Sequence, residues 1–398
     1  MTSLVRSLAL EGNIKVLAAQ TLLSQIGFGM FYVIWQPYLL STGIDIAKLG
    51  LIQTMINVST MLGLFSWGYF SDQLGRRPVV IASDLCRIVA IISLILSRHY
   101  AALMVFAFLI GFTAMFQMGN PARNAMIAES VEPTRVATAL STLMAISQGT
   151  STVMASVGGY VALEMGYSPI LYVTLISDII GFTFLILFLK ETHQIEDKKP
   201  VKESIRVRIN KAILPERTNI LLYTVMLIQG FGYTVAYSLF YGALDAFRGF
   251  TTFELGLMST SFNLVWTIGS IPLGRLSDRI DKKIMLMGSL IMAMITVLGF
   301  IGFTSLPAFL FFNGVNALDI CFWMPSWMSL IAEMEPPQRR SSVMGKLDAY
   351  GKISSLPAPF IGGILLERYG FRAPLYVQVV TLSLAMLVIL RLKVPKSP

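Results

Sequence analysis

Long apolar stretches separated by short polar segments run along nearly the whole chain. Each stretch has about the 20 residues that a helix needs to cross a lipid bilayer. In lipid every backbone amide must bond within its own segment, so stretches of this length predict helices and not strands. The predicted spans are residues 14–40, 48–70, 78–97, 100–128, 137–163, 168–190, 217–244, 252–276, 283–303, 306–334, 341–366 and 371–391.

Composition agrees with this pattern. Hydrophobic residues make up 55% of the chain and charged residues 13%, about half the charged share of a soluble protein. His99 and His193 have no catalytic or metal-ligand spacing around them, and no lysine-bearing glycine loop is present, so we expect neither an enzyme nor a cofactor. Cys86 and Cys321 both lie inside predicted spans and are expected to be packed thiols.

Two strings occur twice at almost the same distance. GYFSDQLGRR at Gly68–Arg77 returns as GRLSDRIDKK at Gly274–Lys283, an offset of 206, and the segment beginning at Pro121 resembles the one beginning at Pro325, an offset of 204. The second offset also relates Gly158, Gly159 and Gly166 to Gly362, Gly363 and Gly370. The chain is therefore predicted to hold two copies of one six-helix half, at residues 1–190 and 217–398, joined by a linker at 191–216.

The chain has 31 Lys and Arg against 22 Asp and Glu, and most of the basic residues fall in loops on one predicted side of the membrane. This bias predicts that both termini and the linker are cytoplasmic, in a multi-pass protein of the cell membrane. It also argues against a nucleic-acid partner, because the excess charge follows topology. The opposite side is predicted to hold Lys48, Arg98, Arg248, Arg368 and Arg372.

Twelve spans in two halves, with G-x-x-x-D-x-x-G-R-R between the second and third, resemble the major facilitator superfamily of secondary transporters. The first copy keeps Gly68, Asp72, Gly75, Arg76 and Arg77, whereas the second has Asp281 where glycine is expected. The resemblance covers nearly the whole chain. It implies an all-α membrane protein whose twelve transmembrane helices form two pseudo-symmetric six-helix bundles.

The resemblance also implies that the repeated loops form a conformational latch between the halves on the cytoplasmic side, with Arg123 and Glu129 in the same charge cluster as Asp72. The alternative is that these charges only fix topology. The candidate latch residues are Gly68, Asp72, Arg76, Arg77, Arg123, Glu129, Gly274, Asp278, Lys282 and Lys283.

Charged residues deep inside a span are costly, so each is expected to be paired or functional. The repeat matches Asp319 and Lys352 with Met115 and Gln148, so these charges exist in one half only and are assigned to the proton or the substrate. Our hypothesis is that Asp319 pairs with Lys352 and that protonation breaks the pair. Asp348, one turn from Lys352, could neutralise the lysine instead.

Arg87, Asp84 and Asp178 lie in spans that the resemblance places on the outside of the bundle, so they are expected to form a structural ion pair. Further polar and aromatic candidates could line the substrate site, or simply pack between helices. These candidates are Gln25, Gln117, Gln148, Gln229, Tyr233, Tyr237 and Trp323.

These features predict alternating-access transport of a small organic solute by a monomer, with proton-coupled efflux as the expected mode. Proton symport or uniport into the cell, a transport-dead sensor and a lipid-handling protein remain alternatives. Met154 and Ala155 replace the Gly-Pro of the drug exporters, and Ala107 replaces an expected arginine, so the sequence does not by itself specify drug export.

Overall fold

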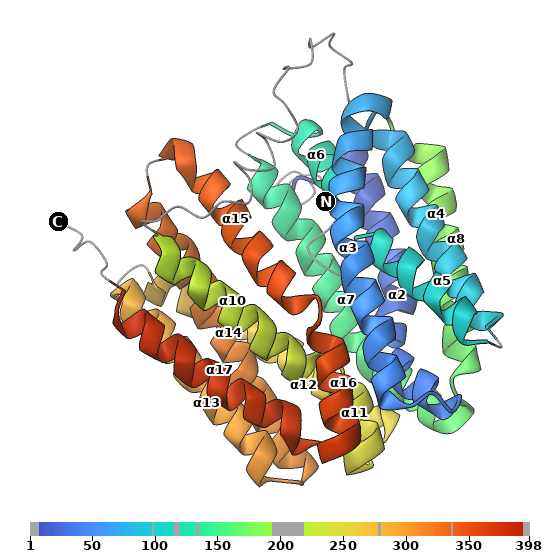
Figure 1. The fold of residues 1–398 in the computed structure, drawn as a ribbon. Helices are drawn as coiled ribbons and strands as arrows, with labels where there is room; N and C mark the ends of the chain where they lie inside the picture. Colours follow the sequence, from blue (N-terminus) through green and yellow to red (C-terminus); the bar gives the residue numbers. More distant parts are fainter. Residues whose placement is uncertain are drawn as a thin grey trace. The chain divides into compact units, whose positions relative to one another are not determined.

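The computed structural model describes residues 8–97, 99–114, 120–132, 135–192, 219–277, 280–335 and 337–392 (Figure 1). These residues form helices joined by turns, and none of them lies in a strand. The helices of the first half are α2 (Gly12–Ser41), α3 (Ile46–Leu74), α4 (Arg76–Ile95), α5 (Tyr100–Phe112), α6 (Pro121–Glu129), α7 (Val136–Met165) and α8 (Ser168–Phe188). Those of the second are α10 (Ile220–Tyr237), α11 (Phe240–Arg248), α12 (Thr252–Ser277), α13 (Lys282–Gly302), α14 (Leu306–Met334), α15 (Pro337–Ser355), α16 (Ala358–Tyr369) and α17 (Arg372–Leu390).

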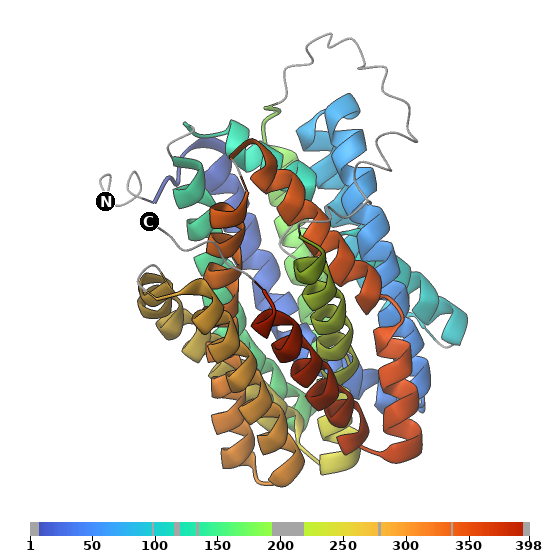
Figure 2. The same cartoon turned by 60° about the vertical axis from the view of Figure 1, so that its left-hand side comes forward.

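Each predicted span coincides with a helix or with two consecutive helices. The spans at 100–128, 217–244 and 341–366 are divided, into α5 and α6, α10 and α11, and α15 and α16. Proline explains the last division, because Pro357 and Pro359 cannot donate the backbone bonds that would continue the helix. Figure 2 shows α15 and α16 as separate helices. Within the described residues, eight helical segments are long and apolar enough to cross a membrane.

Contacts between backbone positions group the chain into two compact units. Unit 1 comprises residues within 1–43, 51–198 and 250–257, and unit 2 residues within 44–50, 199–249 and 258–398. The first residues of α12 thus group with unit 1, and the first residues of α3 with unit 2. Most of the predicted linker, 193–216, lies outside the described residues.

Helix α2 is the central element of unit 1, where it packs against α7 and α8, while α4 packs against α5 and α8. Glycine allows these close approaches. A Cβ added at Gly27 would collide with the backbone of Thr174 on α8, and one at Gly158 would lie 2.5 Å from Met30 Cα on α2. Such crossings are common where helices pack in lipid, because small residues let backbones come together.

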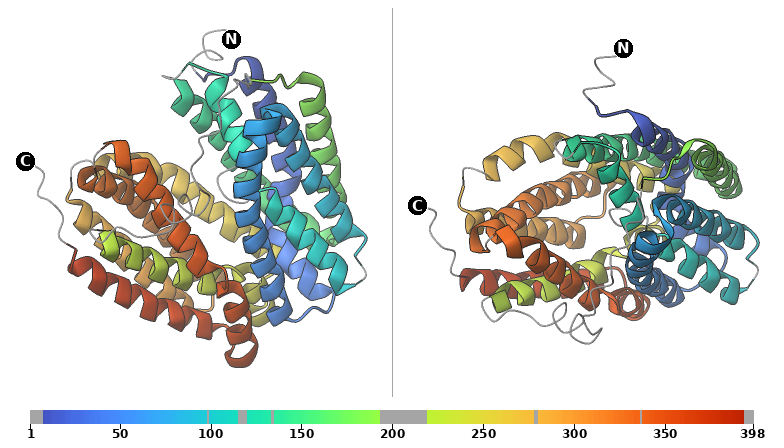
Figure 3. Two further views of the ribbon diagram at one scale, coloured as in Figure 1. Left: turned by 45° about the horizontal axis from the view of Figure 1, so that its top comes forward. Right: turned by 90° about the horizontal axis from the view of Figure 1, so that it is seen from above.

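Unit 2 has the matching arrangement around α10, which packs against α15 and α17, whereas α13 packs against α14 and α17 (Figure 3). A Cβ added at Gly362, the repeat equivalent of Gly158, would lie 2.6 Å from Val235 O on α10. The repeated glycines therefore mediate the same type of crossing in each unit.

The repeat extends to the backbone angles. Gly166 ends α7 with φ 77° and ψ −175°, and Gly370 ends α16 with φ 77° and ψ −174°. A positive φ in this range favours glycine, which has no Cβ to clash. Both glycines stop a helix and let the next one begin two residues later.

The crossing at Gly27 can be tested against a matched glycine. We expect Gly27→Ala to lower the free energy of unfolding by about 1–3 kcal/mol, because the new methyl group overpacks the contact with Thr174. Gly149→Ala on α7 is the control, since an added Cβ there meets nothing within 4 Å. The measurement is thermal unfolding of the purified protein in detergent. A Gly27→Ala variant as stable as Gly149→Ala would show that the crossing tolerates a side chain.

Candidate functional site

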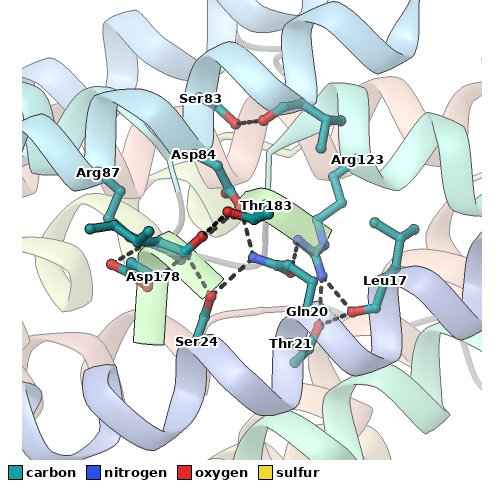
Figure 4. Close-up of polar contacts among 12 residues, drawn as sticks. Leu17, Gln20, Thr21, Ser24, Ser83, Asp84, Arg87, Arg123, Asp178 and Thr183 are labelled. Atoms are coloured by element: carbon teal, nitrogen blue, oxygen red, sulfur yellow. Dashed lines mark hydrogen bonds and ion pairs between the residues drawn. The ribbon is translucent and has the colours of Figure 1, made fainter. Parts of the chain in front are cut away.

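Charged side chains of α4 and α8 meet in the interior of unit 1 (Figure 4). Arg87 donates from Nε to Asp178 Oδ2 at 3.0 Å, and its Nη2 lies 2.9 Å from Asp178 Oδ1. Asp84 Oδ2 is 3.8 Å from the same Nη2. The structure thus brings together the three residues expected to pair, and each is at most 3% exposed.

Helix α2 supplies the polar groups that complete this network. Gln20 donates from Nε2 to Asp84 Oδ2 at 2.8 Å and accepts from Arg123 Nη1 at 2.7 Å. Ser24 Oγ accepts from Arg87 Nη2 at 2.8 Å. We call Gln20, Ser24, Asp84, Arg87, Arg123 and Asp178 the buried network. It contains two arginines and two carboxylates, so its formal charges cancel.

The expected place of Arg123, in a charge cluster with Asp72, is wrong. Its guanidinium is buried and bonds to α2, reaching Thr21 Oγ1 at 2.6 Å and Leu17 O at 3.3 Å. Asn120 caps α6, and Arg123 lies on the buried face of this helix together with Ala122 and Met126.

Asp72, Arg76, Glu129 and Glu191 form a second set of contacts in unit 1, which we call the loop cluster. Arg76 Nη1 lies 2.6 Å from Asp72 Oδ1, and its Nη2 lies 3.0 Å from Glu129 Oε1. Glu191, at the end of the first half, accepts the backbone N–H groups of Arg76 and Arg77 at 2.9 and 3.0 Å. It therefore caps the start of α4, where the free N–H groups attract a carboxylate.

Glycine is required just before this cap. Gly75 has φ 96°, and an added Cβ would lie 2.6 Å from Glu191 Oε2. Gly68, by contrast, has only Pro121 Cβ near its missing side chain, at 3.8 Å. The close helix approach expected at Gly68 is therefore not found among the described residues.

The second copy caps its helix differently. Asp281 accepts the N–H groups of Lys283 and Ile284 at 2.8 and 3.2 Å, so the departure from glycine supplies α13 with a cap of its own. Lys282 lies 3.9 Å from Glu333, and Lys283 donates to Leu390 O at 2.8 Å. Gly274 lies in α12, and Asp278 lies outside the described residues.

Asp319 of α14 is half-buried and lies beside α13 in unit 2. Ser289 of α13 is fully buried and donates its hydroxyl to Asp319 Oδ1. Tyr237, at the end of α10, lies within electrostatic range of Asp319, and its ring centroid lies 4.8 Å from that of Tyr233. The Tyr237 hydroxyl is buried and has no hydrogen-bond partner among the described residues. We call Tyr233, Tyr237, Ser289 and Asp319 the Asp319 cluster.

The expected pairing of Asp319 with Lys352 does not form among the described residues. Asp319 is directed toward α13, whereas Lys352 is an exposed residue of α15. Asp348, one turn earlier on α15, is the carboxylate whose charge acts on the lysine. The hypothesis that protonation of Asp319 frees Lys352 is therefore wrong for this structure.

The remaining candidates are placed as follows. Gln25 accepts from Ser151 at 2.9 Å and donates to Ser147 at 2.8 Å, so it ties α2 to α7. Trp323 stacks on Trp327 within α14, with ring centroids 5.3 Å apart. Gln148 and Gln229 are half-buried, and Gln117 lies outside the described residues.

Carboxylates inside the two units differ in their partners. Asp178 has direct arginine contacts and Asp84 a bond from Gln20 with Arg87 nearby, whereas Asp319 has a hydroxyl group and no ion pair among the described residues. No group of three or more His, Cys, Asp or Glu in the described part could hold a metal ion. Sequence reasoning missed Gln20, Ser24, Ser289 and Glu191. Only the polar spacing of Gln20 and Ser24, one turn apart on an apolar helix, gave a signal for any of them.

The buried network predicts a large cost for removing Arg87. We expect Arg87→Met to lower the free energy of unfolding by about 3–5 kcal/mol, because Asp178 is left as an uncompensated buried charge. Lys48→Met is the matched control, since Lys48 pairs with Asp45 at 2.6 Å on the surface and such pairs contribute about 1 kcal/mol or less. Chemical unfolding of both variants in detergent is the measurement. Equal losses would show that charge pairing does not hold the network.

Comparison with known proteins agrees with this architecture. The sequence profile of the Major Facilitator Superfamily matches residues 17–252 and 222–398. Multidrug resistance protein MdtG of Enterobacter lignolyticus is 24% identical over 315 residues, covering 77% of this chain and 73% of that protein. An uncharacterised MFS-type transporter of Methanocaldococcus jannaschii is 31% identical over 128 residues, but the match spans only 32% of this chain and 33% of that protein.

A solved structure of a bacterial homologue of the iron transporter ferroportin, in an inward-facing state, superposes with a TM-score of 0.75. It is 16% identical and the match covers 95% of this chain and 98% of that one, so it supports the fold alone. The predicted all-α membrane fold of two six-helix bundles is thereby confirmed. The chain belongs to the major facilitator superfamily of membrane transporters and is not an enzyme.

Proposed function

We propose that this protein exports a small amphipathic organic solute across the cell membrane in exchange for protons, and that Asp319 carries the proton. The observation that supports the proposal most directly is the environment of Asp319, a half-buried carboxyl group of unit 2 with a hydroxyl partner and no ion pair among the described residues. The relative MdtG, named a multidrug resistance protein, supports the efflux direction.

A proton carrier must be stable both with and without its proton. An isolated ionised carboxylate is expensive to bury, and an ionisable group within a membrane span is a functional candidate by default. A hydroxyl suits such a group, because it can donate to a carboxylate or accept from a carboxylic acid. Ser289 therefore supports Asp319 in either state.

The buried network, unlike Asp319, is suited to one protonation state. Asp178 is held by two atoms of Arg87, and charge-assisted contacts of this kind favour one protonation state strongly. Removing the charge of Asp178 would leave the arginine uncompensated. We therefore assign the network to the scaffold of unit 1 and not to proton transport.

The aromatic groups near Asp319 suggest the class of solute. Tyr233 and Tyr237 lie together on α10, and Trp323 is one turn from Asp319 on α14. Aromatic faces attract organic cations, and a carboxylate adds charge complementarity. We infer that the solute is an amphipathic organic cation, which would compete with the proton for Asp319.

We further propose that Asp72 serves as the latch residue and that both termini are cytoplasmic. Asp72 contacts Arg76, yet its side chain is 71% exposed, which leaves it available to a second partner. Arg76 is only 12% exposed and is shared with Glu129, so the loop cluster holds the position of Asp72 from within unit 1. A monomer is sufficient for this mechanism.

Transport in proteoliposomes tests the role of Asp319. With ethidium as the cationic probe, we expect Asp319→Asn to abolish transport driven by a pH gradient, because the variant cannot carry a proton. Exchange of labelled for unlabelled ethidium should continue at higher ethidium concentration, because the aromatic contacts remain while the attraction of the carboxylate is lost. Asp245→Asn, a carboxylate change elsewhere in unit 2, should retain driven transport.

Other outcomes would identify a different proton-carrying residue or a different mode of transport. Undiminished driven transport by Asp319→Asn together with its loss in Asp348→Asn would move the carrier to α15. Wild-type transport that is insensitive to the pH gradient would favour a uniporter, and accumulation with the proton gradient would favour a symporter. The absence of exchange for any cation would contradict the proposed solute class.

A further inference from the structure

Two arginines meet at one end of unit 2. Arg248 is the last residue of α11, and its guanidinium carbon lies 4.6 Å from the centre of the Phe371 ring. Phe371 directly precedes Arg372, the first residue of α17, and the two guanidinium groups are near enough to repel each other. Arg368, in the last turn of α16, adds a third positive charge to the same connection.

These charges have no counter-ion among the described residues. Neither Arg248 nor Arg372 forms an ion pair with any described residue, although Asp245 precedes Arg248 by one turn. Arg248 Nε is buried and has no hydrogen-bond partner among the described residues. A buried donor normally has a partner, and like charges held together favour an anion between them.

The position of Arg372 indicates where that anion comes from. Exposed side chains on α17 follow a spacing of about one turn, at Tyr376 (53%), Val380 (58%), Leu384 (47%) and Leu387 (59%). On a membrane helix such an exposed apolar stripe faces acyl chains. Arg372, itself exposed, lies one turn before Tyr376 at the head of this stripe, at the level where tyrosine marks the membrane interface.

The geometry points to a binding site for an anionic phospholipid, in which Arg248 and Arg372 hold the phosphate and the stripe from Tyr376 to Leu387 holds an acyl chain. Guanidinium groups bind phosphate through paired hydrogen bonds, and the first N–H groups of α17 add a favourable dipole. Free phosphate could use the same donors but would gain nothing from the stripe. This site is separate from the Asp319 cluster, and the inference does not rest on the proposed transport.

Lipid retention measured by native mass spectrometry tests the site. We expect Arg372→Gln to lose phosphatidylglycerol about fivefold more readily than the wild type, as removal of one basic contact to an anionic lipid implies. Phosphatidylcholine, which has no net charge, should be retained weakly and equally by both proteins. Arg391→Gln, the same change at the other end of α17, is the control and should behave as the wild type.

Further variants test the same site independently. Arg248→Gln should lose phosphatidylglycerol as readily as Arg372→Gln. If Arg248→Gln fails to fold, the variant of the exposed Arg372 tests the site by itself. Arg372→Lys, which keeps the charge but not the paired bonds, should fall between the wild type and Arg372→Gln. Equal retention by Arg372→Gln and Arg391→Gln would overturn the proposal. So would competition by millimolar inorganic phosphate that removes all bound phosphatidylglycerol, because the site would then be one for a free anion.

Discussion

A charge inside the membrane must find a partner within the protein, and this constraint determines how the two units are built. In unit 1 it is met by Arg87, Asp178 and the side chains of α2, which together join four helices around one electrically balanced centre. In unit 2 it is met at Asp319 by a hydroxyl group. The same requirement is thus met by ion pairs in unit 1 and by a neutral hydrogen-bond donor in unit 2.

Glycine is the second requirement, because the absence of a side chain lets neighbouring helices approach closely. The helices of each unit approach closely only because Gly27 and Gly158 in unit 1, and Gly362 in unit 2, present no side chain to the neighbouring backbone. Close approach brings Gln20 within reach of Asp84 and Arg123, so packing and charge pairing depend on each other. Lipid contributes little to either, since acyl chains are as apolar as the side chains they touch.

The sequence was sufficient to predict the helices, the duplication and the family, because all three rest on length, hydropathy and repeated strings. It also identified Arg87 and Asp178 as neighbours, through their similar depth in the membrane and through the family resemblance, which places their helices on the outside of the bundle. A similar depth in the membrane did not predict the partners of Asp319 and Lys352 correctly. The direction in which each side chain leaves its helix also depends on how the helix is rotated about its axis. Arg123 was misplaced for a similar reason, as its side chain lies on the buried face of α6.

The cap provided by Glu191 has a mechanical consequence. This residue lies where the chain leaves α8, yet its carboxylate bonds to the first two N–H groups of α4, more than a hundred positions earlier. Thr192, the next residue, bonds to Glu129 of α6. Tension applied to the chain beyond Thr192 would therefore act directly on the two helix ends that position Arg76.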